Sequence, residues 1–516
     1  MGIQQSKSAS ASAAAARAHD KAMADRLRRM KLADDSVSAF SGDMVDNEKG
    51  AFLASIARDP HPLPLDTVTV IPSQFLEDPR NRLALTALSS ADPKAVLRSQ
   101  ASKNANQHLF NTKIPFEGAP ITNQRSSGRC WLFASTNVFR VALMKKYNLE
   151  SFELSQSYLY YYDKLEKSNW FLEQIIDTVD EDLDGRLLQG LLGDLISDGG
   201  QWDMVYNLVE KYGLVPQALY PDSWNAKASG VLNSVLKTKL REFAIRLRTT
   251  ILTGDAKAPG QITAMKGKMM LEIQQIITLL LGPTPNPTES FTWQYADKDG
   301  KVHELSITPK DFAKNITSSG FPAVNSSTVA DMISLVNDPR NDYMSLLTVD
   351  RLGNVIGGRD TTYINVDMET LKEACIKTIK AGLPIFFGCD VGKFSDKTSG
   401  IMDLKLYDYE VGLSTSLLNM SKEERLRSGE SQMTHAMVLT AVHLDEKTGK
   451  PVRWRVQNSW GPDAGEKGWF VMTDEWMDQF VYQAVIDVKF LSKEVKEVRG
   501  QDPIVLPLWD PMGALA

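Results

Sequence analysis

The sequence has few cysteines, no long apolar run and no metal-binding spacing. Only three cysteines (Cys130, Cys375 and Cys389) occur among 516 residues, too few for a disulfide framework, and they indicate a reducing compartment. No run of about 18 consecutive apolar residues occurs, so we expect no membrane span. The six histidines are scattered, and neither Cys-x-x-Cys nor His-Glu-x-x-His is present. We therefore expect no metal site and no cofactor.

The overall charge gives no general reason to expect nucleic-acid binding. The net charge is −6, and the hydrophobic and charged fractions are those of an ordinary globular protein. One basic segment stands out, and it is expected to be helical. It is either a nucleic-acid patch or a solvated helix face, and the acidic total favours the solvated face. Its cations are Lys237, Lys239, Arg241, Arg246 and Arg248.

Residues 1–55 differ from the rest of the chain. They are rich in Ser and Ala but lack the apolar centre of a secretory signal, so we interpret them as a flexible tail. The segment Met1–Ser6 also fits the N-myristoylation pattern. The Ala/Ser/Arg bias is similar to a mitochondrial transit peptide, although Asp20 and Asp25 weaken that interpretation. Globular composition begins after this tail and continues to residue 516.

A short motif around Cys130 carries the clearest chemical signal. Gln124 stands six residues before Cys130, and Trp131 follows the cysteine directly. Small apolar residues then recur with the period of one helix face, which predicts a helix of about four turns that begins near Cys130. A thiol at a helix N-terminus is expected to have a lowered pKa and to act as a nucleophile.

A histidine and an asparagine lie near the open end of a predicted hairpin. Two apolar strands, 435–443 and 452–456, are joined by a turn. A turn centred on the middle of that loop places His435 directly opposite Asn458. Either residue alone is most simply structural, but together they suit a base and the group that orients it.

These motifs resemble the active site of papain-like cysteine peptidases. The resemblance rests on Gln124, Cys130-Trp131, His435 and the segment Asn458-Ser-Trp-Gly. Ser127 stands where the papain signature has a cysteine, which suits an intracellular chain. The nucleophile and the histidine are roughly 300 residues apart, about double the separation in papain, so large insertions are expected.

A closer resemblance is to the bleomycin hydrolase family. It extends from about residue 60 to the last residue, and it rests on the same motifs together with Asp198-Gly-Gly-Gln-Trp-Asp203 and the terminal segment 509–516. It implies an α+β, papain-like fold with a helical left subdomain, an antiparallel β right subdomain and large, mainly helical insertions. One peptidase domain would then span 56–516, with a mainly helical insertion at 223–341.

The resemblance also implies roles for individual residues. Cys130 would attack the carbonyl, His435 would transfer protons, and Asn458 would orient the imidazole. Gln124 would donate to the oxyanion, Trp460 would shield the Asn458–His435 bond, and Gly199 and Gly200 would bind substrate backbone. A C-terminal arm, 503–516, would lie in the cleft, where the carboxylate of Ala516 would meet a substrate amine.

The family resemblance further implies an aminopeptidase that acts on peptides and on bleomycin-like amides. It implies a homohexamer and a cytoplasmic protein with a mitochondrial form. Two other hypotheses stay open from the residues alone. The first is a nucleic-acid-binding or scaffolding ring with secondary peptidase activity. The second is a Cys-His acyltransferase, which would more usually have Asp where this chain has Asn458.

Overall fold

The computed structural model describes residues 65, 72–255, 258, 260–314 and 331–515. The chain divides into two units, residues 1–85 and 86–516. In the first unit the described residues hold most of α4 (Pro79–Leu88). The predicted tail 1–55 lies outside the described residues, and so does Ala516.

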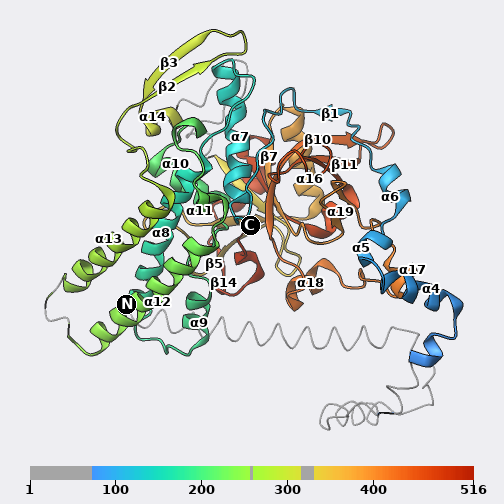
Figure 1. The fold of residues 1–516 in the computed structure, drawn as a ribbon, viewed down its shortest axis with the longest axis horizontal. Helices are drawn as coiled ribbons and strands as arrows, with labels where there is room; N and C mark the ends of the chain where they lie inside the picture. Colours follow the sequence, from blue (N-terminus) through green and yellow to red (C-terminus); the bar gives the residue numbers. More distant parts are fainter. Residues whose placement is uncertain (1–64, 66–71, 256–257, 259, 315–330, 516) are drawn as a thin grey trace. The chain divides into compact units, whose positions relative to one another are not determined.

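The helices of the second unit lie mainly in its N-terminal half, drawn in blue to yellow-green in Figure 1, and those beyond residue 367 are orange to red. They are α5 (Pro93–Val96), α6 (Gln100–Ala105), α7 (Cys130–Lys146), α8 (Gln156–Asp177), α9 (Arg186–Gly193), α10 (Trp202–Tyr212), α11 (Trp224–Lys227), α12 (Gly230–Leu252), α13 (Gln261–Leu281), α14 (Pro309–Lys314), α16 (Met368–Lys380), α17 (Tyr409–Leu413), α18 (Lys422–Ser428), α19 (Asp474–Phe480) and α20 (Lys493–Val498). Short 3-10 turns are η2 (Gln217–Leu219), η3 (Val488–Phe490) and η4 (Pro511–Gly513).

Most strands of the described residues form a single sheet of mixed direction. Its order is β14-β5-β6-β4-β13-β7-β10-β11-β12-β9-β8, and β1 also pairs with β10. The separate pair β2–β3 forms its own hairpin. The bounds are β1 (Thr112–Lys113), β2 (Phe291–Ala296), β3 (Val302–Ile307), β4 (Met332–Val336), β5 (Ser345–Val349), β6 (Thr362–Asn365), β7 (Ile385–Cys389), β8 (Ser395–Asp396), β9 (Ile401–Met402), β10 (His435–Leu444), β11 (Pro451–Gln457), β12 (Trp469–Thr473), β13 (Val481–Asp487) and β14 (Ile504–Leu506).

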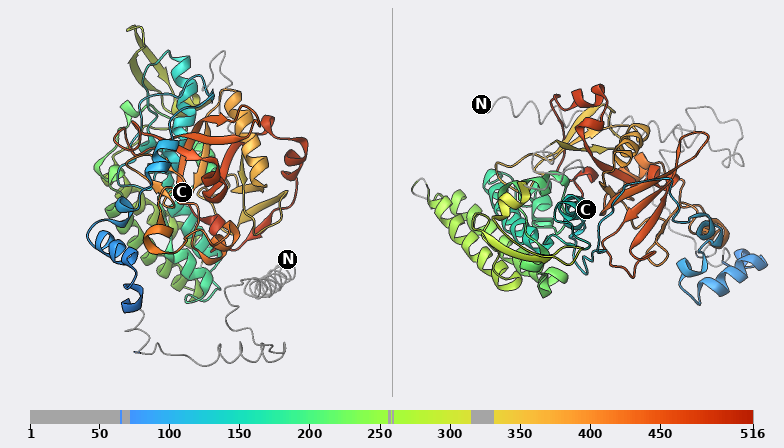
Figure 2. Two further views of the ribbon diagram at one scale, coloured as in Figure 1. Left: turned by 90° about the vertical axis from the view of Figure 1, so that its right-hand side faces the viewer. Right: turned by 90° about the horizontal axis from the view of Figure 1, so that it is seen from above.

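Helix α7 lies between the other large helices and the sheet (Figures 1 and 2). Its side chains are buried from Cys130 to Met144 on every side, because α8 and α10 pack on one side and β10 packs on the other. The predicted start and length of this helix agree with the structure. The expectation of a single apolar face is wrong, because a helix enclosed by two layers has no solvated face.

The β10–β11 hairpin forms as predicted, but its register differs from the prediction. Val438 pairs with Gln457, two residues later than the predicted partner. The turn closes with the Asp445 N–H donating to the Lys450 carbonyl at 2.8 Å, and bulges follow along the strands. Asn458 therefore lies just beyond the end of β11 instead of directly opposite the histidine.

The segment 223–341 contains α11, α12, α13 and α14, and it also contains the β2–β3 hairpin. That hairpin was missing from the sequence-based expectation. Its strands alternate between more and less exposed residues, and a Gly300 turn with φ +81° joins them. Both are ordinary hairpin signals. Trp293 on β2 is 5% exposed and packs at 5.6 Å, ring centre to ring centre, from Tyr147 just after α7.

Candidate active site

Cys130 opens α7 and faces β10. Only 2% of the residue is exposed. The backbone N–H of Ala436, the second residue of β10, hydrogen-bonds to the thiol and favours its thiolate form. Ala436 directly follows His435, so the structure brings the predicted nucleophile and the predicted base together where α7 packs on the strand.

His435 is held in a fixed orientation by two neighbours. Its Nε2 lies 2.9 Å from Oδ1 of Asn458, and its ring stacks on Trp460 with ring centres 4.9 Å apart. The Asn458 oxygen also accepts the backbone N–H of Ser459 at 2.7 Å. Because an amide oxygen only accepts, it selects the tautomer with a proton on Nε2, and Nδ1 is then the nitrogen that can exchange protons.

Burial keeps both reactive groups uncharged. It raises the pKa of Cys130 to about 11, and it lowers the pKa of His435 to about 4, although the hydrogen bond that His435 donates to Asn458 opposes this. The expected lowering of the thiol pKa by the helix terminus is therefore outweighed by burial. A proton that passed from the thiol to the imidazole would create both charges together, and each ion would stabilise the other.

Gln124 is fixed at both ends of its amide. Its Nε2 donates to the Ser127 carbonyl at 2.7 Å, and its Oε1 accepts the Ser459 hydroxyl at 2.7 Å. Its backbone N–H donates to the Ser459 carbonyl at 2.8 Å. An amide nitrogen carries two hydrogens, so one remains for another acceptor. The side chain is 7% exposed and thus preorganised as a donor.

The segment before Gln124 pairs with the segment after Asn458. Asn123 and Trp460 form an antiparallel bridge, and the Gly461 N–H donates to the Thr122 carbonyl at 3.0 Å. Gly461 has φ +83°, and a Cβ there would lie 2.4 Å from the Asn123 side chain. Glycine is therefore needed where the two motifs meet.

Gly199 and Gly200 lie beside Trp131, the residue that follows the nucleophile. A Cβ on Gly200 would stand 2.6 Å from the Trp131 ring, so this glycine is needed for packing whether or not it also binds substrate. The Gly199 carbonyl accepts from Lys167 Nζ at 2.6 Å. The ammonium of Lys167 also lies 5.0 Å from the centre of the Trp131 ring.

The C-terminal arm, residues 503–516, extends to the glycine pair Gly199-Gly200. Gln201, next to Gly200, donates its Nε2 to the Ala514 carbonyl at 2.7 Å. Upstream, β14 pairs in parallel with β5, and the Arg186 guanidinium lies 3.9 Å from the ring centre of Trp509. The described part of the arm therefore ends beside the glycine pair, and Ala516 lies outside the described residues.

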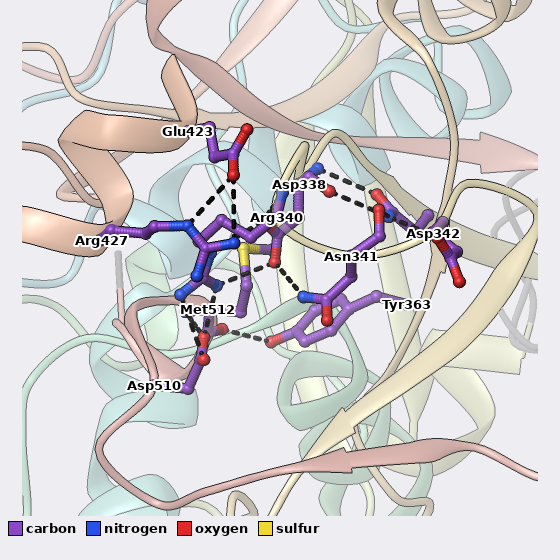
Figure 3. A network of polar contacts seen from close by, with 10 residues as sticks. Asp338, Arg340, Asn341, Asp342, Tyr363, Glu423, Arg427, Asp510 and Met512 are labelled. Carbon is purple, nitrogen blue, oxygen red and sulfur yellow. Dashed lines mark hydrogen bonds and ion pairs between the residues drawn. The ribbon is translucent and has the colours of Figure 1, made fainter. Parts of the chain in front are cut away.

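A cation anchors the arm just before its end (Figure 3). Arg340 donates to both carboxylate oxygens of Asp510, at 2.7 and 3.2 Å, and its other side donates to Asp338 at 2.8 and 2.9 Å. Burial alone would lower the pKa of Arg340, but the two carboxylates raise it well above its usual value. The Tyr363 hydroxyl donates to the Met512 carbonyl at 3.3 Å, so the turn after Asp510 is held as well.

The five cations of the predicted basic helix all have acceptors within the chain. They lie on α12 as expected. Carboxylates pair with Lys237, Lys239 and Arg246 and offset part of the charge that α12 can offer to an external phosphate. Arg241 and Arg248 donate to uncharged carbonyls and keep their full charge. The contacts are Lys237 with Asp194, Lys239 with Glu242 and Glu272, Arg241 with the Leu192 carbonyl, Arg246 with Glu242, and Arg248 with the carbonyls of Thr178 and Glu181.

Several residues of the site were not found from the sequence. Ala436 acts through its backbone, which no side-chain motif reveals. Ser459 lies inside a quoted motif, but only the fold shows that its hydroxyl holds Gln124. Gln201 lies beside the glycine pair, and Arg340 is distant in sequence from the Asp510 that it binds. Among the described residues no cluster of three potential metal ligands occurs.

Residues 63–513 match the model of the Peptidase C1-like family. The chain belongs to the Peptidase C1-like family. It is 45% identical over 457 residues to "Bleomycin hydrolase" of Homo sapiens and of Mus musculus, which covers 87% of this chain and 98% of each relative. It is 45% identical over 451 residues to "Cysteine proteinase 1, mitochondrial" of Saccharomyces cerevisiae, covering 86% of this chain and 91% of that protein.

A solved structure supports the same family. The crystal structure of PepW from Lactobacillus rhamnosis superposes with a TM-score of 0.82 at 39% identity, covering 88% of this chain and 99% of that one. The chain is thus a cysteine-type peptidase of the C1-like family with an α+β, papain-like fold. Among the described helices, none is long and apolar enough to cross a membrane.

Replacing His435 with glutamine should change how the thiol ionises. The variant has no proton acceptor, so the thiolate forms only by loss of a proton whose pKa burial raises to about 11. We expect alkylation of Cys130 by iodoacetamide to slow by about 100-fold or more at pH 7, and to quicken about tenfold for each pH unit up to pH 10. The measurement is the alkylation rate against pH, followed by intact mass.

His443→Gln is the matched control for this prediction, because His443 lies on the same strand near the turn. Its alkylation profile should equal that of the wild type. An unchanged rate at pH 7 in His435→Gln would contradict the assignment of His435 as the proton acceptor.

Proposed function

We propose that the chain is a cysteine aminopeptidase that removes N-terminal residues from peptides and hydrolyses bleomycin-like amides, with its own C-terminus restricting cleavage. The single observation that carries this proposal is the Gln201–Ala514 hydrogen bond. It places the arm beside Gly200, which itself contacts Trp131 next to the nucleophile. The relatives named bleomycin hydrolase, which are 45% identical over nearly their whole length, support the same activity.

The chemistry proceeds through an acyl-enzyme. The Cys130 thiol transfers its proton to Nδ1 of His435, and its sulfur attacks the amide carbonyl. The developing oxyanion accepts the backbone N–H of Cys130 and the free N–H of the Gln124 amide. His435 then protonates the leaving amine, and later takes a proton from the water that releases the acyl group. Asn458 keeps the imidazole aligned through both steps, and Trp460 covers that bond.

The arm restricts cleavage by occupying the side of the cleft beyond the N-terminal residue. In this proposal the terminal carboxylate of the arm, assigned to Ala516, would pair with the free amine of a substrate. A peptide that extends past this point would meet the arm. The Arg340–Asp510 ion pair fixes where the arm begins its approach, and the Gln201 contact fixes where it arrives.

The proposal also includes an oligomeric state and a cellular location for the protein. We propose a homohexamer whose contacts involve the insertion, where Trp224 and Leu279 are apolar side chains that assembly would cover, at 76% and 85% exposed. A cytoplasmic protein with a mitochondrial form is supported by the free cysteines and by the relative named mitochondrial. The alternative, a nucleic-acid-binding or scaffolding ring, receives less support because the cations of α12 are engaged within the chain.

Cys130→Ala should abolish hydrolysis of a fluorogenic aminoacyl substrate. Without the sulfur no acyl-enzyme forms, and we expect a loss of about 10,000-fold or more in kcat/KM. Cys375→Ala is the matched control, since Cys375 is a buried cysteine of the core and its loss should leave the rate per folded molecule unchanged. Retained hydrolysis in Cys130→Ala would refute the proposal and favour a scaffold whose activity lies elsewhere.

Deleting residues 513–516 should convert exopeptidase into endopeptidase behaviour. The cleft would then accept longer peptides, so cleavage of an N-acetylated peptide should rise about tenfold or more, while the rate on aminoacyl substrates should fall because the amine loses its partner. Both are measured by mass spectrometry of the products. Unchanged cleavage of the N-acetylated peptide would refute the blocking role.

Arg340→Gln tests the anchor without shortening the chain. Loss of the bidentate pair should free the arm part of the time, and cleavage of the N-acetylated peptide should rise about three- to tenfold. Lys372→Gln is the matched control, because Lys372 also bridges two carboxylates, those of Asp474 and Asp478, and does not contact the arm. Equal effects of the two variants would mean that general loosening, and not the anchor, is responsible.

A further inference from the structure

Asp198 collects hydrogen-bond donors from separate segments of the fold. Its Oδ1 accepts Lys164 Nζ at 2.7 Å, the Tyr160 hydroxyl at 2.8 Å and Asn233 Nδ2 at 2.8 Å. Two of these donors come from α8 and the third comes from α12. The Lys164 side chain is fully buried, and that of Asp198 is 10% exposed.

The other oxygen of the Asp198 carboxylate faces residues 124–129, which lead to Cys130 and are here called the catalytic loop. Oδ2 accepts the backbone N–H of Gly128 at 3.1 Å and the Ser229 hydroxyl at 2.5 Å. Gly128 is two residues before Cys130. A Cβ on Gly128 would lie 2.8 Å from the Asp198 Cβ, so the glycine permits the loop to come this close.

Asp198 also binds the residue that follows the nucleophile in the chain. Its backbone carbonyl accepts Trp131 Nε1 at 2.7 Å. Asp198 therefore binds the chain on both sides of Cys130. Its side chain accepts from Gly128 before the cysteine, and its main-chain carbonyl accepts from Trp131 after it. The residue next to Asp198 begins the glycine pair, so the same contacts also set the distance between the nucleophile and that segment.

The carboxylate stays ionised in this environment. Burial by itself would raise the pKa of Asp198, but the Lys164 ammonium and the hydrogen bonds lower it well below its usual value. A hydrogen bond to an ionised acceptor is about twice as strong as one between neutral groups. The bond from Gly128 is therefore stronger than an ordinary loop contact.

No disulfide holds the catalytic loop in position. Between Gln124 and Cys130 there is no second cysteine, and Cys130 itself is free. The segment that leads into α12 adds two further contacts to the loop. Arg129 forms a bidentate pair with Asp222 at 2.9 Å for each bond, and the Ser126 N–H donates to the Lys227 carbonyl at 2.9 Å.

We propose that Asp198 is a positioning residue for the oxyanion site. By holding Gly128 and Trp131 it fixes the backbone N–H of Cys130 and the Gln124 loop in the geometry that receives the developing oxyanion. Ser229 and Asn233, at the start of α12, hold the carboxylate in place, so the helical insertion takes part in setting this geometry. The inference rests on the cysteine peptidase chemistry proposed above for Cys130.

Asp198→Asn is a nearly isosteric test. An amide has one oxygen, and the buried Lys164 ammonium needs it, so the amide N–H₂ would face the Gly128 N–H and that hydrogen bond would be lost. Burial is the main cause of the raised pKa of Cys130, and the negative charge of Asp198 is a smaller cause in the same direction. Removal of that charge therefore does not weaken thiolate formation. The substitution therefore separates oxyanion stabilisation from thiol reactivity.

Two rates are measured on the full-length protein. We expect kcat/KM for amide hydrolysis to fall about 10- to 100-fold, mainly through kcat. Alkylation of Cys130 by iodoacetamide develops no oxyanion, so its rate should stay within about threefold of the wild type. Tyr160→Phe is the matched control, since it removes one donor from the other oxygen only, and both of its rates should stay within about threefold.

Two results would overturn the proposal. The first is an unchanged kcat/KM in Asp198→Asn. The second is an equal loss of hydrolysis and alkylation, which indicates general disorder of the site. If Asp198→Asn does not fold by circular dichroism, Ser229→Ala takes its place, because Ser229 donates to the same oxygen as Gly128. It should lower kcat/KM about three- to tenfold with alkylation preserved, and an unchanged kcat/KM would overturn the proposal.

The wild-type protein separates this inference from the proposed aminopeptidase function. Each variant is compared with the wild type on both an aminoacyl substrate and an N-acetylated peptide. A wild type that cuts only the N-acetylated peptide would refute the aminopeptidase proposal. The ratio of variant to wild type on that peptide would still decide the role of Asp198.

Discussion

The first turn of α7 contacts β10, and there the backbone N–H of Ala436, the residue after His435, hydrogen-bonds to the Cys130 thiol. Burial on both sides keeps the two groups neutral at rest. The other residues of the site hold the reactive side chains in position. Asn458 and Trp460 fix the imidazole, and Ser459 fixes Gln124. The burial of α7 from Cys130 to Met144 provides low-dielectric surroundings, in which transfer of a proton between the two groups would cost less than ionisation of either group alone.

Polar contacts, and not covalent bonds, hold the catalytic loop of this peptidase. The two carboxylates of Asp198 and Asp222 receive the Gly128 N–H and the Arg129 guanidinium, and all three cysteines are free. Buried ion pairs are costly unless every donor and acceptor is satisfied. Both oxygens of the Asp198 carboxylate are satisfied, because it accepts from five donors. They link α8, α12 and the catalytic loop, so a segment that looked like a remote insertion in the sequence supports the reactive centre.

Much of the site could be predicted from the sequence, because its chemistry is carried by residue types at fixed spacing. Gln124, Cys130, His435 and Asn458 were all found in this way, as were α7 and the hairpin that carries the histidine. The register of that hairpin was not, since bulges and the exact turn depend on packing against β7 and β1. The role of Asp198 was also hidden, because its partners are scattered between residues 128 and 233 and come together only in the folded chain.

The C-terminal arm is also part of the sheet. β14 pairs in parallel with β5 and forms the last strand at that end, and Leu506 and Met512 pack into a small core with Tyr363. Exposed sheet edges favour pairing with other chains. Loss of the chain from residue 504 onward would therefore uncover the N–H and C=O groups of β5 as well as open the cleft. With the arm in place, the edge of the sheet is the three-residue β14 and not the longer β5, and a shorter edge strand offers fewer unpaired groups to another chain.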